Sequence, residues 1–83
     1  MKKKVTYGQR LAIIIMTAHE MDYEVSMLQE AEGIIKQGRS IDVFEIGWFE
    51  KCAADAHEKI KSMGEAAVVK ANAIGKRLID EFL

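Results

Sequence analysis

The chain has 83 residues and a mass of 9.3 kDa, contains no proline, and is 49% hydrophobic and 30% charged. This composition excludes an intrinsically disordered chain, and the length fits one helical domain over residues 1–83. A net charge of −1 argues against a dedicated nucleic-acid-binding domain, which is normally strongly basic. Because Cys52 is the single cysteine, an internal disulfide and a cysteine-based zinc site are both excluded.

Positive charge is concentrated at the start of the chain. We expect residues 1–5 to be a disordered basic segment whose lysines, together with Arg10, could contact phosphates or an acidic surface; the alternative is a solvated start that aids solubility. These residues are Lys2, Lys3, Lys4 and Arg10. The apolar run that follows is too short for a membrane span and lacks a signal-peptide cleavage pattern. We therefore predict a soluble, cytoplasmic protein that does not contact the membrane.

A long first helix is predicted from residue 6 to residue 38. Thr6-Tyr7-Gly8-Gln9 matches a capping box, and Gly38 is a suitable C-terminal stop. Between them, apolar residues recur at spacings of three, four or seven: Leu11, Ile14, Ala18, Met21, Val25, Leu28 and Ile35. A break between His19 and Asp22 remains open.

The second half of the chain shows another continuous helical pattern. After a loop at Gly38-Arg39-Ser40, Asp42-Val43-Phe44-Glu45 matches a second capping box, although Ser40 could cap instead. A strand over Ile41 to Phe49 is the alternative to a helix there. The apolar series then runs through Phe49, Ala53, Ala56, Ile60, Met63, Ala67, Ala71, Ile74, Leu78 and Phe82.

A third capping box, Ser62-Met63-Gly64-Glu65, and the flexibility of Gly64 favour a break in this second helix. The predicted fold is therefore all-α, a small bundle of three helices. A two-helix hairpin, in which the second helix is unbroken, is the alternative.

The first helix carries a second apolar stripe opposite the first. It consists of Ala12, Met16, Tyr23, Met27 and Ile34. A helix that is apolar on two faces is usually buried between partners. In so short a chain, the second partner could be another copy, and we therefore expect a homodimer.

The second helix places aromatic residues away from its apolar seam. Phe44, Trp48 and Cys52 lie at spacings of four, and Trp is enriched at the centres of protein interfaces. We predict that Phe44 and Trp48, with Tyr23 and Met27 of the second stripe, bind a partner. The alternative is that the Phe44/Trp48 face packs beneath the first helix.

Catalytic and metal-binding patterns are not found in the sequence. His19 and His57 each precede a glutamate, but Met16 and Ala54 occupy the positions where a Glu-x-x-His di-metal motif requires glutamate. The glycines form no phosphate-binding loop, and Cys52 has no sequence neighbour that would activate it. We expect no cofactor, no metal and no enzymatic activity.

These patterns favour a non-enzymatic helical protein that acts by binding another macromolecule. A protein is the expected partner, as for the small steric inhibitors that phages and plasmids encode as accessory proteins. The alternative is a nucleic-acid-associated regulator, a dimer that places two basic N-terminal arms against phosphates.

Overall fold

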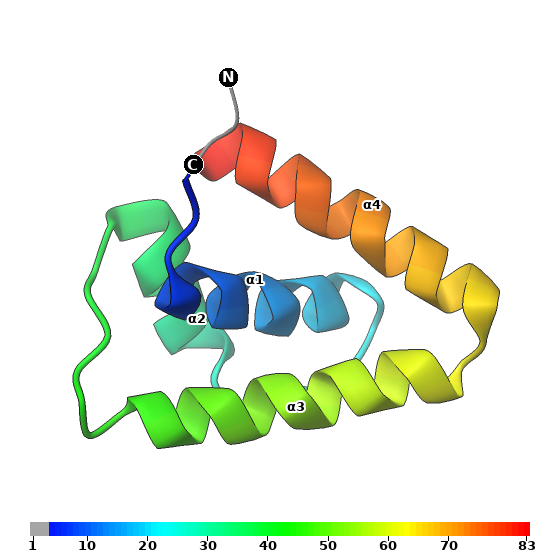
Figure 1. Ribbon diagram of the computed structural model, residues 1–83, viewed down its shortest axis with the longest axis horizontal. Helices are drawn as coiled ribbons and strands as arrows, with labels where there is room; N and C mark the ends of the chain where they lie inside the picture. Colours follow the sequence, from blue (N-terminus) through cyan, green and yellow to red (C-terminus); the bar gives the residue numbers. More distant parts are fainter. Residues whose placement is uncertain (1–3) are drawn as a thin grey trace.

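All regular structure among residues 4–83, the part of the chain that the computed structural model describes, is α-helical. Helix α1 spans Tyr7–Glu20, α2 spans Leu28–Gln37, α3 spans Ile46–Ser62 and α4 spans Glu65–Phe82. Figure 1 shows α1 between α3 and α4, with α2 crossing behind it. The all-α prediction is confirmed. The predicted number of helices is wrong, because residues 4–83 form four where we expected three or two.

The predicted capping box at the start of α1 is present. The backbone N–H of Gln9 donates to the Thr6 hydroxyl at 3.1 Å, and the backbone N–H of Thr6 donates to the Gln9 side-chain carbonyl at 2.9 Å. Two N–H groups that lack partners within the helix are satisfied in this way. The box therefore fixes α1 to begin at Tyr7.

The first helix ends at Glu20 rather than continuing to Gly38. Asp22 adopts a left-handed backbone conformation with φ of 63°. The N–H of Tyr23 donates to the carbonyl of Ala18, and the N–H of Asp22 donates to that of His19, which is the pattern of a Schellman motif. Aspartate is one of the few residues other than glycine that enters this region readily. The break that the sequence left open is therefore present, and it produces the additional helix.

Helix α1 is the central element of the core. Its buried residues face every direction around the helix axis: Leu11, Ala12, Ile13, Ile15, Met16, Thr17 and Ala18. Helices α2, α3 and α4 of the same chain all pack against it. The two apolar stripes that led us to expect a second copy are thus covered within one chain.

Helix α2 folds back along α1 and stops where predicted. Ala31, Ile34 and Ile35 join the same buried cluster as the α1 residues. Gly38 ends the helix in the left-handed conformation, with φ of 72°. A straight continuation of α1 would have left these three side chains in solvent, and their burial therefore stabilises the break at Asp22.

The segment between α2 and α3 forms half of the second predicted capping box. The Glu45 carboxylate accepts the N–H of Asp42 at 3.1 Å, but the Asp42 carboxylate accepts the N–H of Phe44 at 2.9 Å, in an Asx turn. Helix α3 consequently begins at Ile46, four residues after the expected cap. The strand alternative for residues 41–49 is excluded, because those residues form a turn and then a helix.

The predicted break at Gly64 is confirmed. This glycine has φ of 105°, a backbone conformation that residues other than glycine rarely adopt. The third capping box does not form, since the Ser62 hydroxyl donates to the carbonyl of Lys59 and α4 has no side-chain cap. Helix α4 then diverges from α3, and its one buried residue is Leu78.

Candidate protein-binding surface

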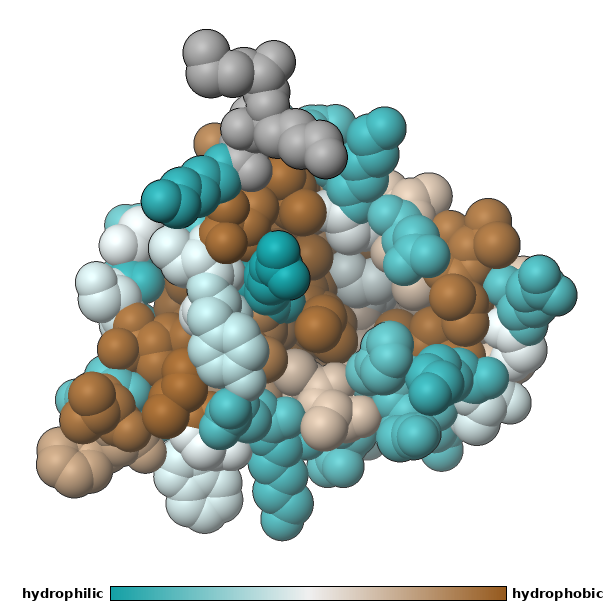
Figure 2. Space-filling model, viewed as in Figure 1, coloured by the Kyte–Doolittle hydropathy of each residue, from teal (hydrophilic) through white to brown (hydrophobic). Residues whose placement is uncertain are grey.

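Three large apolar side chains are exposed together where α3 begins. Val43 is 78% exposed, Phe44 85% and Trp48 67%. We call these three residues the Trp48 patch. In Figure 2, hydrophobic surface gathers at the lower left, where Figure 1 shows the start of α3. The alternative interpretation, in which the Phe44/Trp48 face packs beneath the first helix, is therefore wrong.

The helical repeat explains why Trp48 is exposed. Each residue turns about 100° around the helix axis. The core side of α3 is formed by Phe49, which is completely buried, and by Ala53, Ala56 and Ile60. Trp48 precedes Phe49 by one residue and therefore lies away from α1, in solvent. Cys52, one turn further on, is half-buried and packs against the main core cluster.

Polar contacts hold the turn that presents Phe44. The guanidinium of Arg39 donates to the Glu45 carboxylate at 2.9 Å, and Asp42 donates to the same carboxylate through its backbone. The Arg39 hydrogen bond and then the Asp42 backbone bond lower the pKa of Glu45 below its ordinary value of 4.5. The pKa of Arg39 is raised, chiefly by the same hydrogen bond with Glu45. The turn is therefore held by an ionised carboxylate.

A second acidic contact ties the start of α1 to α3. The Tyr7 hydroxyl donates to the Glu50 carboxylate, and this hydrogen bond raises the pKa of Tyr7. Glu50 is exposed and lies two residues after Trp48. The Trp48 patch lies within residues 42–50, and hydrogen bonds link both ends of this segment to other parts of the chain.

The structure brings Met27 close to Trp48. Both line a shallow pocket of about 310 Å³ with Ser26, Lys51, Cys52 and Asp55. Tyr23 lines a neighbouring pocket of about 350 Å³, which shares Ser26, Cys52 and Asp55 with the first. Of the four predicted partner-binding residues, Phe44 lies in the turn before Trp48 and the other three border these two pockets.

Tyr23 has a clear structural role besides its position at the surface. It is half-buried against the cluster of Ala18, Ala56 and Ile60. The ammonium of Lys59 lies 5.2 Å from the centroid of its ring, which is a cation–π distance. A substitution of Tyr23 would therefore perturb the fold as well as the surface.

None of the predicted basic residues that the structure describes belongs to the Trp48 patch or lines the two pockets beside it. Lys4 and Arg10 are exposed, and Lys2 and Lys3 lie outside the residues that the structure describes. The prediction of disorder for residues 1–5 likewise concerns mainly this undescribed part. Arg10 is on α1, whereas the patch is on the turn before α3 and on α3 itself.

The two histidines are exposed, His19 at the end of α1 and His57 on α3. Among residues 4–83, no group of three or more His, Cys, Asp or Glu side chains is placed to hold a metal ion. Within the same range, no helix has both the length and the apolar character needed to span a bilayer. The Cys52 sulfur accepts a weak hydrogen bond from the Ser26 hydroxyl at 3.9 Å.

Sequence reasoning missed two features of the surface. The first is that Val43 belongs to the Trp48 patch. Its position next to Phe44, in a segment that forms a turn, was the sequence signal that could have indicated this. An apolar groove between α1, α3 and α4 could not be predicted, because it depends on the angle at which α4 leaves α3.

Comparisons of the chain with protein-family models, curated proteins and solved structures give no match.

Proposed function

We propose that the protein acts without catalysis, by binding another protein through the Trp48 patch and thereby blocking or recruiting that partner. The observation that carries this proposal is the joint exposure of Val43 and Phe44, on a turn held by hydrogen bonds, and of Trp48 in the first turn of α3. Large apolar side chains that are exposed side by side mark interaction sites more often than isolated ones do.

The physical basis is the burial of aromatic surface. A tryptophan at the centre of an interface commonly contributes about 2 kcal/mol or more to binding, which corresponds to a factor of about 30 in Kd. Lys51 and Asp55, which border the pocket beside Trp48, would remain at the rim and steer the approach. A partner with an apolar site bordered by both signs of charge fits this surface.

The expected homodimer and cytoplasmic location remain part of the proposal. We place the interface with a second copy at the Trp48 patch, because three large apolar side chains are exposed there. Light scattering on the wild type and on a Trp48→Ala variant tests the expected homodimer. A mass near twice 9.3 kDa that falls to 9.3 kDa in the variant would support a dimer through the patch.

The proposed function is tested by affinity capture from the native host. Wild type, Trp48→Ala and a control, Val69→Ala, serve as baits; Val69 is 64% exposed on α4 and lies outside the patch. We expect one protein to be retained by the wild type and by the control and lost with Trp48→Ala. Equal retention by all three baits would contradict a role for the patch.

A further inference from the structure

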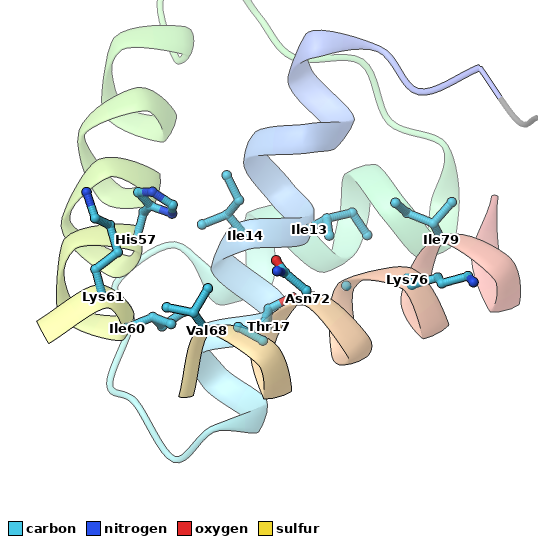
Figure 3. Close-up of a pocket in the computed structure, with 12 residues that line it drawn as sticks. Ile13, Ile14, Thr17, His57, Ile60, Lys61, Val68, Asn72, Lys76 and Ile79 are labelled. Atoms are coloured by element: carbon cyan, nitrogen blue, oxygen red, sulfur yellow. The ribbon is translucent and has the colours of Figure 1, made fainter. Parts of the chain in front are cut away.

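A second candidate surface is the groove bordered by α1, α3 and α4. Its volume is about 370 Å³, and Figure 3 shows side chains from all three helices around it. Ile13 and Ile14 come from α1, Ile60 from α3, and Val68 and Ile79 from α4. Apolar surface is also visible at the centre of the face shown in Figure 2, with hydrophilic side chains around it.

The polar side chains that border this groove are basic or neutral. His57 and Lys61 lie on α3 and Lys76 lies on α4, while none of the twelve lining residues is an aspartate or glutamate. Within residues 4–83, the ammonium groups of Lys61 and Lys76 have no carboxylate within 4.0 Å. The groove therefore combines an apolar floor with a positive rim.

Two arginines on the helices that border the groove differ in whether they are paired with carboxylates. Arg77, next to Lys76 on α4, pairs with Glu20 and Glu81. Arg10 precedes Ile13 and Ile14 by three and four residues on α1, and therefore extends the same face of that helix. It is exposed and adds to the positive charge at one end of the groove.

The dimensions indicate what kind of occupant fits. Along α4, the lining runs from Val68 to Ile79, a rise of about 16 Å, or three helical turns. An open groove of this length suits a helix that anchors apolar residues at spacings of three, four and seven. A second copy that met this one groove to groove would place Lys61 and Lys76 opposite the same basic residues, which is unfavourable.

We infer that the groove between α1, α3 and α4 binds an acidic amphipathic helix of a partner protein. The apolar stripe of that helix would cover Ile13, Ile14 and Val68, and its carboxylates would face Lys61 and Lys76. This surface is separate from the Trp48 patch and does not depend on the function proposed for that patch.

The test uses two synthetic peptides of about 14 residues, or four helical turns. Both carry leucines at the same amphipathic spacing, and the remaining positions are glutamate in one peptide and lysine in the other. In amide and methyl NMR spectra of the full chain, the glutamate peptide should shift resonances of Ile13, Ile14, Val68 and Ile79 saturably, and less strongly at high salt. The lysine peptide should cause no saturable shift.

Charge-reversed variants make the test specific. Lys61→Glu with Lys76→Glu should weaken binding of the glutamate peptide about tenfold, since two attractive rim contacts become repulsive. The matched control is Lys70→Glu with Ala54→Glu and Ala73→Glu, which has the same net charge and alters exposed residues of the same two helices outside the groove. Circular dichroism verifies that both variants are folded, and Lys61→Gln with Lys76→Gln, which removes charge without repulsion, should weaken binding less.

Several results would overturn the inference. One is an equal affinity for the glutamate and lysine peptides, and another is an equal loss of affinity in the charge-reversed variant and in its matched control. A third is a set of resonance shifts confined to Phe44 and Trp48. The last result would leave the Trp48 patch as a binding surface while removing the groove, and the two proposals can therefore fail separately.

Discussion

The neighbours Trp48 and Phe49 provide a sharp test of how α3 is oriented. Trp48 is 67% exposed and Phe49 is completely buried. Replacement of each by alanine removes a large aromatic side chain at almost the same point of the chain. If α3 faces α1 as the structure shows, the two variants should differ greatly in stability.

The expected magnitudes follow from burial. Phe49→Ala leaves a cavity in the main core cluster and should lower the free energy of unfolding by about 3–5 kcal/mol. A chain of 83 residues has a total stability of about 4–12 kcal/mol, and Phe49→Ala therefore removes much of it. Trp48→Ala should change the free energy of unfolding by no more than about 0.5 kcal/mol, as is usual for an exposed side chain.

Urea denaturation followed by far-UV circular dichroism measures both values. Phe49→Leu serves as a milder variant if Phe49→Ala does not fold, and it should lie between Phe49→Ala and the wild type. A loss of about 2 kcal/mol or more for Trp48→Ala would show that the tryptophan belongs to the core. That result would refute the proposed binding role as well as the orientation of α3.

Three further changes test the helix ends and the electrostatics by the same denaturation assay. Asp22→Gly should raise stability by about 0.5–1 kcal/mol, because φ of 63° is unfavourable for a residue with a side chain; a loss would contradict the left-handed cap. Gly75→Ala should add up to about 1 kcal/mol of helix stability, because the new Cβ would lie 3.6 Å from Ile13, an ordinary contact; a loss would indicate closer packing of α1 and α4. Since the pKa of Glu45 is lowered in the folded state, its ionised form stabilises the fold at neutral pH, and this contribution should disappear as the pH falls below 4.5. The wild type should therefore exceed Glu45→Gln in stability at pH 7 and approach it in acid; a difference that stays constant with pH would argue against the Arg39 contact.

The helices were predictable where local chemistry determines them. The Thr6 capping box, the Gly38 stop and the Gly64 break all depend on residues within one turn, and all three are present. The break at Asp22 has a weaker local signal, since aspartate only tolerates the left-handed conformation. It becomes favourable because α2 then buries Ala31 and its neighbours against α1.

The candidate site was predictable only in part, for a related reason. Helical spacing placed Phe44 and Trp48 away from the seam of α3, but it could not show whether another helix covers them. That depends on the path of the whole chain, which sends α1 along the Phe49 side of α3 and leaves Trp48 exposed. The same limitation made α1 resemble an interface helix, because periodicity does not distinguish contacts within a chain from contacts between chains.

The central claim is that the folded chain leaves Trp48 uncovered and that a partner protein covers it. Because Trp48 is the single tryptophan, a chain labelled with 5-fluorotryptophan gives one ¹⁹F resonance. In the isolated protein, diluted until light scattering gives the mass of a monomer, we predict a shift between H₂O and D₂O close to that of the urea-unfolded chain, and loss of this solvent effect in the complex with the captured partner. A resonance that is insensitive to solvent in the isolated protein, or unchanged in the complex, would contradict the account.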